Sequence, residues 1–292
     1  MSERMAKLGI IGGSGLYAMD GLTDVTEVQV DTPFGQPSDT ITIGTLQGVS
    51  IAFLPRHGRG HRVTPTEVPA RANIWALKSL GVERVLSVSA VGSLREDYAP
   101  LHLVVPDQIY DRTKLRPNTF FGGGLVAHVS FADPYCPHFS GLVWDAMGGF
   151  TDFEKHRGGT YVCIEGPQFS TKAESEVYRK LSCDIIGMTA IPEAKLAREA
   201  ELCYATIACV TDYDVWHESA EAVTNDMVVA NLAKNVGNAK RVIQQLVSTL
   251  PPTREGQACP CVNAIAASFA TDKSLITPEL RKKYDLLVGK YL

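Results

Sequence analysis

The sequence predicts an α/β protein in which helices cover a central sheet. Apolar runs of four to eight residues alternate with longer amphipathic segments, a pattern typical of strands buried between helices. Neither an internal repeat nor a low-complexity linker divides the 292 residues, so a single domain over residues 1–250 is expected. The breaker cluster "PPTREGQACP" then begins a C-terminal extension, residues 251–292, which is expected to pack on the same domain.

Strands are predicted where short apolar runs are bounded by turn residues. They are Leu8–Ile11, Ile51–Leu54, Arg84–Ser89, Leu101–Val105, Tyr161–Ile164, Asp184–Ile186 and Ala205–Val210. Helices are predicted from apolar residues at helical spacing. They are Val68–Leu80, Lys172–Lys180, Pro192–Glu199 and Asp226–Val247. Thr171 followed by Glu174 fits a capping box before the second of these helices, and Pro192 fits the first turn of the third.

The composition is that of an ordinary soluble protein. Apolar residues make up 45% of the chain, charged residues 21%, and the net charge is −4, which argues against nucleic acid as a partner. The first residues lack the apolar core and cleavage site of a signal peptide, and no run approaches ~18 apolar residues. We therefore expect a cytoplasmic protein with no membrane partner.

The seven cysteines show neither the spacing of a zinc site nor a dense disulfide framework, so most are expected to be reduced core thiols. They are Cys136, Cys163, Cys183, Cys203, Cys209, Cys259 and Cys261. The exception is Cys259-Pro260-Cys261, whose two thiols could form a strained local disulfide or chelate a soft metal.

Two glycine-rich or basic loops follow predicted strands. "GIIGGSGLY" fits either a tight turn or an anion site, in which backbone amides and the Ser14 hydroxyl approach a phosphate. A dinucleotide fingerprint is incomplete there, because Ala18 stands where its third glycine is required. "FLPRHGRGHRVTP" delivers Arg56 and His57 to a strand end, where a guanidinium offers a bidentate fork for phosphate.

Four further apolar runs are followed by residues that could contact a ligand. Small or aromatic residues follow three of them, and two aspartates follow the fourth. They lie in "VLSVSAVGSL", "CIEGPQFSTKAE", "IIGMTAIPEA" and "TDYDVW". Phe169 could stack on a ring, although Phe169 and Met188 also fit a core position. Alternation along a strand would place Asp212 and Asp214 on one side, with Tyr213 opposite, while a turn or capping role is the alternative. Gathered at one sheet edge, these groups indicate a site for an anion plus an aromatic, sugar-bearing ligand.

Ordered motifs from about Leu8 to about Val247 resemble those of one enzyme family. They are "GIIGGSGL", "DTPFGQPSD", "RHGRGH", "NIWALKSLG", "AVGSLRED", "DQIYDRT", "DPYCP", "IEGPQFST", "GMTAIPEAKLAREAELCYA" and "TDYDVW". The chain resembles the 5'-methylthioadenosine phosphorylases of the trimeric purine nucleoside phosphorylase superfamily. The resemblance implies a three-layer domain with a mixed sheet, a trimer or dimer of trimers, and cleavage of the nucleoside by inorganic phosphate as co-substrate. It implies no cofactor and no metal.

The resemblance also implies roles for individual residues. Phosphate is expected to bind Ser14, Arg56, His57, Ser89, Ala90 and Thr189. Met188 is expected beneath the ribose, and the base pocket is expected to contain Gly92, Phe169 and Ser170. His128, donated across a subunit interface, and Val228 in the region 225–228 are expected near the 5' substituent. Cys136 and Cys203 lie in family-like segments and form a candidate disulfide pair.

The resemblance assigns catalysis to the two aspartates. Asp212, with a pKa raised by burial and by a neighbouring like charge, would protonate N7 of the departing base, and Asp214 would accept from the 6-amino group. Relatives selective for 6-oxopurines carry asparagine at position 212 and glutamate at position 170, so adenine is expected to be favoured. Asn225 stands where the family has a small apolar residue, which leaves the preference for a 5'-methylthio over a 5'-hydroxyl group less secure.

Three other functions remain open from the sequence. A broader purine nucleoside phosphorylase would act on adenosine, inosine or guanosine. A nicotinamide-dependent oxidoreductase would use the glycine-rich loop, and a nucleoside-binding protein would lack turnover.

Overall fold

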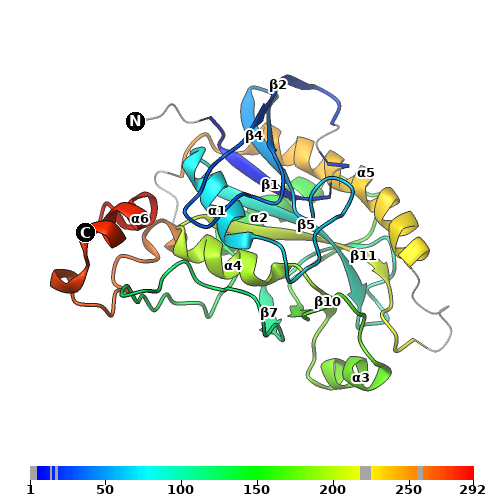
Figure 1. Ribbon diagram of the computed structural model, residues 1–292. Helices are drawn as coiled ribbons and strands as arrows, with labels where there is room; N and C mark the ends of the chain where they lie inside the picture. Colours follow the sequence, from blue (N-terminus) through cyan, green and yellow to red (C-terminus); the bar gives the residue numbers. More distant parts are fainter. Residues whose placement is uncertain (1–4, 14, 17–18, 218–224, 255–258) are drawn as a thin grey trace.

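A mixed, eleven-stranded sheet with helices on both faces forms the body of the computed structural model (Figure 1), which describes residues 5–13, 15–16, 19–217, 225–254 and 259–292. The strands are β1 (Leu8–Gly12), β2 (Leu22–Val28), β3 (Ile41–Leu46), β4 (Val49–Pro55), β5 (Arg84–Ser93), β6 (Leu103–Val105), β7 (Gln108–Asp111), β8 (Lys155–Arg157), β9 (Thr160–Cys163), β10 (Ile185–Gly187) and β11 (Cys203–Asp212). The helices are α1 (Ala70–Ser79), α2 (Pro137–Met147), α3 (Lys172–Lys180), α4 (Ala190–Glu199), α5 (Asn225–Thr249) and α6 (Pro278–Val288), with 3-10 turns η1 (Pro260–Asn263) and η2 (Lys273–Leu275).

The sheet order is β2-β3-β4-β1-β5-β10-β9-β7, and β11 pairs with β5 and β6, which in turn pairs with β8. Strand β1 runs parallel to β4 and β5, and β11 runs parallel to β5, whereas β10 is antiparallel to β5. The mixed three-layer α/β fold expected from the sequence is therefore confirmed.

Every predicted strand and helix is present, with ends shifted by a few residues. Strand β6 starts at Leu103, because Leu101 has a left-handed backbone with φ of 76° and ends the preceding turn. The capping box of α3 is present: Thr171 accepts from the Glu174 amide while the Glu174 carboxylate accepts from the Thr171 amide.

Six elements were not predicted, and most of them carry a weak apolar signal. Strand β2 is exposed along most of its length, while β7 and β8 are short and polar. Helix α2 begins with Pro137 after an unexpected cap, the Cys136 thiol, which accepts from the Phe139 amide. Strand β3 and helix α6 complete the set.

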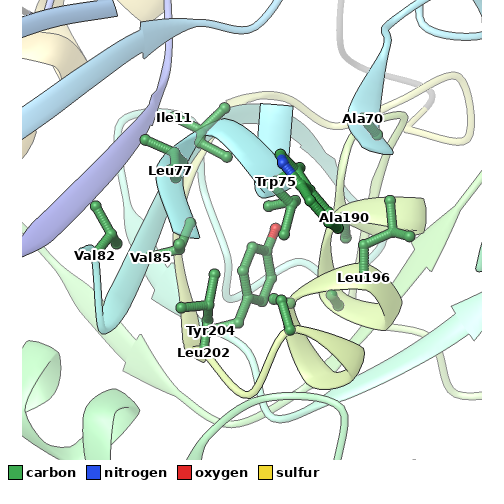
Figure 2. Close-up of a cluster of buried hydrophobic side chains, with 14 of the residues drawn as sticks. Ile11, Ala70, Trp75, Leu77, Val82, Val85, Ala190, Leu196, Leu202 and Tyr204 are labelled. Atoms are coloured by element: carbon green, nitrogen blue, oxygen red, sulfur yellow. The ribbon is translucent and has the colours of Figure 1, made fainter. Parts of the chain in front are cut away.

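Two apolar layers lie on opposite faces of the sheet, as β11 shows. Tyr204, Ala208 and Val210 join the cluster under α1 and α4, while Ala205 and Ile207 join the cluster under α2 and α5. Alternate residues of a strand point to opposite faces, so a strand buried at all ten positions must be covered on both sides. Figure 2 shows part of the first cluster, with side chains from β1, α1, β5, α4 and β11 gathered together.

The C-terminal segment packs onto this body beside α1 and α4 (Figure 1). Ile276, Tyr284 and Leu287 are buried in the first cluster, and Cys261 is buried in the second. Among the residues that the structure describes, no helix is both long enough and apolar enough to span a bilayer.

We expect Leu86→Ala to lower the free energy of unfolding by about 2–5 kcal/mol, because Leu86 is fully buried in β5 and its truncation leaves a cavity. The matched control is Leu275→Ala, whose side chain is 71% exposed and whose truncation should change stability by less than about 0.5 kcal/mol. Urea denaturation of both variants measures the difference. Equal losses would contradict the assignment of β5 to the centre of the core.

Candidate active site

An opening beside strand β5 defines the candidate site. Strand β1 pairs with β5 only from Arg84 to Ser87, and β10 pairs with it only at Gly92 and Ser93. Between these pairings, residues 88–91 have no strand partner on that edge among the described residues, while β11 continues along the other edge. Ser89 and Ala90 lie in this opening. α/β proteins bind ligands where neighbouring strands diverge, in the crevice at the carboxyl ends of the strands.

Ser89 presents an unused donor at this opening. Its side chain is 5% exposed, and Oγ is buried without a hydrogen-bond partner in the described part of the chain. A buried hydroxyl normally has a partner, so this group is suited to a ligand oxygen.

Arg56 follows β4 and contacts the end of β1 and the middle of β5. Its amide donates to the Gly12 carbonyl at 2.9 Å, and its guanidinium donates to Glu193 (2.5 and 3.2 Å) and to Ser87 Oγ (2.7 Å). It also donates to the Ile11 and Val88 carbonyls. Burial opposes the charge, but the ion pair with Glu193 outweighs it and raises the pKa of Arg56.

These contacts change the expected use of Arg56. The sequence predicts a bidentate fork for phosphate, whereas the fork is occupied by Glu193, which leaves one Nη1 hydrogen for a ligand. Glu193 is 1% exposed and also accepts from the Tyr204 hydroxyl at 3.0 Å. Sequence reasoning missed this acid. The signal in the sequence is a glutamate in the apolar first turn of α4, because burying a charge there without a partner would destabilise the fold.

His57 is held as a neutral ring. Nδ1 lies 2.8 Å from the Val63 carbonyl, so this nitrogen carries the proton, and the ring stacks on His61. Burial, and then the charge of Arg56, lower the pKa of His57 to about 4. At neutral pH, Nε2 therefore carries a lone pair and can accept a hydrogen bond from a ligand hydroxyl.

Thr189 and Met188 complete this group before helix α4. The Thr189 hydroxyl lies 3.3 Å from the Tyr161 hydroxyl and makes no capping bond to the helix. A small cavity is lined by Arg56, His57, Met188, Thr189 and Glu193 among others. The structure therefore brings together predicted residues from two distant segments.

Asp212 and Asp214 meet at the end of β11, close to β5. Asp212 Oδ1 accepts from the Asp214 amide at 2.8 Å and Oδ2 accepts from the Thr211 hydroxyl at 2.7 Å. Asp214 Oδ2 is buried without a hydrogen bond in the described part of the chain. Burial raises the pKa of both aspartates. A Cβ at Gly92 would lie 2.8 Å from Asp212 Oδ1, so a glycine is required where the carboxylates approach β5.

Strand alternation, expected from the sequence to place Asp212 and Asp214 on one side, is not what brings them together. The strand ends at Asp212, and Asp214 has a left-handed φ of 52°, so a turn rather than strand alternation brings the two together. The Asp214 amide donates to the Asp212 carboxylate, so Asp212 also has the turn-stabilising role considered as the alternative from the sequence.

Three residues outside the predicted site hold this strand end in place. Asn231 and Asn235, one turn apart on α5, donate to the Thr211 and Val210 carbonyls at 2.7 and 2.9 Å. Trp216 donates from Nε1 to the Ser93 carbonyl at 2.7 Å, which ties the turn after Asp214 to β5. The positions of these three residues in the sequence do not predict their contacts with the strand end.

The loop before α3 carries Phe169 and Ser170, the two residues expected in the base pocket. Phe169 is 50% exposed, so the core alternative for this residue is wrong, and Ser170 Oγ is buried without a partner among the described residues. Gly166 has φ of 68°, and a Cβ there would lie 2.4 Å from Met188 Sδ. Arg116, which sequence reasoning missed, donates to the carbonyls of Glu165 and Met188, both at 2.6 Å, and thereby joins the two loops.

Of the remaining residues expected near the site, only His128 has a side chain that the structure describes. Ser14 lies outside the described residues, as do the side chains of Asn225 and Val228 at the start of α5. His128 is exposed, and its amide donates to the Ser268 carbonyl. It lines a separate open cavity of about 440 Å³, and none of the other described site residues lines that cavity.

Comparison with known proteins places the chain in a family. The model of the phosphorylase superfamily matches residues 7–248. S-methyl-5'-thioadenosine phosphorylase from Koribacter versatilis is 56% identical over 98% of this chain and 97% of its own length. The similarity thus extends into the C-terminal segment, beyond the family match.

Solved structures agree with this relationship. The crystal structure of a methylthioadenosine phosphorylase from an Antarctic soil metagenomic library has a TM-score of 0.92 and 50% identity, covering 98% of this chain and 99% of that one. A mutant adenosine/methylthioadenosine phosphorylase from Schistosoma mansoni, in complex with methylthioadenosine, has a TM-score of 0.78 and 39% identity, covering 83% and 91%. The chain therefore belongs to the phosphorylase superfamily, and within it to the S-methyl-5'-thioadenosine phosphorylase family.

Proposed function

We propose that this protein cleaves the N-glycosidic bond of 5'-methylthioadenosine with inorganic phosphate, giving adenine and 5-methylthioribose 1-phosphate. The observation that carries the proposal is the pair of buried aspartates facing Gly92, next to the opening along β5. The names of the relatives support the same substrate. The reaction is a pentosyl transfer and calls for phosphate as co-substrate but for no redox or group-carrying cofactor.

Asp212 is proposed as the proton donor to N7 of the leaving adenine. Its hydrogen-bond environment accommodates both protonation states. When the carboxylate is ionised, the Thr211 hydroxyl donates to Oδ2 at 2.7 Å. When Oδ2 is protonated, the Thr211 hydroxyl can accept a hydrogen bond from the carboxyl group and donate to the Val91 carbonyl at 3.2 Å instead. Because the pKa of Asp212 is raised by burial, the protonated form is more accessible than for an exposed aspartate.

Asp214 is proposed as the acceptor for the 6-amino group of adenine. Oδ2 of this residue is buried and makes no hydrogen bond in the described chain, and an exocyclic amine would supply a donor. Burial raises the pKa of Asp214, although the Ser175 hydroxyl lies near enough to the carboxylate to lower that pKa in part. Phe169, half-exposed on its loop, is proposed to stack on the purine, with Met188 beneath the ribose. Ser170 stands where relatives selective for 6-oxopurines carry a glutamate, so position 170 offers no acid to a 6-oxopurine.

Phosphate is proposed to bind in the opening beside β5. Ser89 Oγ and the remaining Nη1 hydrogen of Arg56 are donors there, and Thr189 contributes a further hydroxyl. Neutral His57 would accept from the hydroxyl of hydrogen phosphate through Nε2. The anion would then act as nucleophile at C1' and stabilise the developing oxocarbenium charge.

Adenosine is the second candidate substrate. Asn225 is polar at the position expected to contact the 5' substituent, and the Schistosoma mansoni relative is described as an adenosine/methylthioadenosine phosphorylase. Comparing phosphate-dependent base release from methylthioadenosine, adenosine and inosine distinguishes these functions. Inosine as the best substrate would overturn the assignment of Asp212 and Asp214 and would favour a broader purine nucleoside phosphorylase.

We further propose a cytoplasmic homo-oligomer, either a trimer or a dimer of trimers, in which His128 completes the site of a neighbouring subunit. The position of His128 in the separate cavity supports this arrangement, because none of the other predicted site residues that the structure describes lines that cavity.

We expect Asp212→Asn to lower kcat/KM for methylthioadenosine by at least ~10²-fold, because an amide cannot protonate N7. Inosine cleavage should fall less or rise, since asparagine suits a 6-oxopurine. Asp152→Asn, an exposed aspartate paired with Arg241 at the surface, is the control and should retain activity. Steady-state rates with both nucleosides test this, and an unchanged rate with methylthioadenosine would rule out the proton-donor role.

We expect Ser89→Ala to raise the KM for phosphate by roughly 10- to 100-fold, the loss of one hydrogen bond of about 1.5–3 kcal/mol to a charged group. The KM for methylthioadenosine should change little, because the hydroxyl faces the anion. Ser79→Ala in α1, whose hydroxyl bonds the Ala76 carbonyl, is the control. A rise confined to the nucleoside KM would contradict the phosphate assignment.

Mixing inactive variants tests the role of His128. If each site combines His128 of one subunit with Asp212 of the next, His128→Ala and Asp212→Asn chains refolded together at equal amounts should regain about one quarter of wild-type activity. If His128 serves its own subunit, no hybrid site is complete, and the mixture should stay at the average of the two variants. Light scattering on the same samples gives the oligomer size.

A further inference from the structure

Four cysteine thiols from three distant segments meet at the end of the sheet opposite the aspartates. The four-cysteine cluster consists of Cys136, Cys203, Cys259 and Cys261, whose sulfur atoms all lie within 4.8 Å of one another. Cys259 Sγ lies 3.3 Å from both Cys136 Sγ and Cys203 Sγ. All seven cysteines are free thiols, so neither disulfide considered from the sequence is present in the structure.

The sulfurs are arranged as four ligands around one point rather than as two pairs. In a tetrathiolate zinc site, Zn–S bonds of about 2.3 Å place the sulfurs about 3.8 Å apart. The distances in the cluster bracket that value, so small side-chain shifts would bring the four sulfurs to it. Cys259 is equally distant from two partners, a geometry that selects no single disulfide.

The surroundings of the cluster favour thiolates. Cys136 caps helix α2, and its sulfur accepts from the Phe139 amide, at the positive end of the helix dipole. Arg254 donates to Cys203 Sγ at 3.7 Å, and the fully buried Arg84 lies close enough to Cys203 and Cys136 to interact with both thiols.

We propose that the four-cysteine cluster binds one structural zinc ion through four thiolates. Binding releases four thiol protons to solvent and leaves a site of charge −2 beside the guanidinium groups of Arg84 and Arg254. A zinc ion suits four soft sulfur ligands in tetrahedral geometry. Because no ligand position remains for water or substrate, the site serves stability.

The proposed ion joins the C-terminal segment to the main sheet. Cys203 begins β11 and Cys136 precedes α2, whereas Cys259 and Cys261 flank the start of η1. Cys203 lies nine residues before Asp212 on β11, about 30 Å away along an extended strand. Loss of the metal should therefore lower the unfolding temperature while leaving the KM for nucleoside nearly unchanged.

Metal content and thiol content of the full-length protein test the proposal. The protein is produced in the cytoplasm, purified without a polyhistidine tag, and measured by elemental mass spectrometry. About one zinc per chain is expected for the wild type and for Cys183→Ser, a buried thiol outside the cluster. Cys203→Ser and Cys261→Ser should lose most of the zinc. Circular dichroism confirms that each variant is folded.

Two further measurements guard against a variant that fails to fold. Wild-type protein stripped of metal should develop thiolate-to-cobalt charge-transfer absorption on titration with Co²⁺, saturating at about one equivalent. Denatured wild-type protein in chelator should yield all seven thiols with Ellman's reagent. Five or three thiols without zinc would show disulfides instead and would overturn the proposal, as would seven thiols with neither zinc nor a cobalt spectrum. None of these readouts depends on turnover, so they stand apart from the proposed function.

Discussion

The buried ion pair between Arg56 and Glu193 is the constraint on which the candidate phosphate site depends. It connects the loop after β4 to helix α4, and Arg56 also bonds groups of β1 and β5. Removing one partner from such a pair is strongly destabilising, because the other charge is left in a region without water. The guanidinium therefore connects four elements, and these contacts fix the positions of the donors around it that face the ligand.

The two functional halves of the site are fixed in different ways. On the phosphate side, neighbouring strands diverge, and the Ser89 hydroxyl is left without a partner in the described chain. On the base side, the end of β11 is restrained by two asparagines of α5 and the turn after it by Trp216, so the carboxylates are held against β5 before any ligand arrives. This preorganisation is what an electrostatic mechanism requires, because aligned groups need not reorganise as charge develops.

Much of this arrangement could be predicted from the sequence, since buried strands and amphipathic helices have strong periodic patterns. The exposed strand β2 and the polar strand β8 could not, because pairing with a neighbour rather than apolar content stabilises them. Glu193 and Arg116 were missed for a related reason. Their roles depend on partners far away in sequence, such as Arg56 for Glu193, and one sequence without structure does not reveal such pairs.

The cysteines illustrate the same limit. The local Cys259-Pro260-Cys261 motif was visible, but its two partners are contributed by residues 56 and 123 positions away from Cys259. Spacing rules recognise metal sites whose ligands arrive in closely spaced pairs. A cluster assembled by tertiary folding from a helix cap, a strand start and a terminal segment has no such spacing.

The pairing of β11 with β5 has a chemical consequence. Asp212 stands opposite Gly92 in the ladder, and every residue of β11 is buried. Sliding β11 by one position would present a threonine hydroxyl or a tyrosine ring at that glycine and would turn each apolar side chain toward the wrong layer. Selection for a well-packed interior therefore also preserves the acid's place, so the same alignment of two strands underlies both folding and proton transfer.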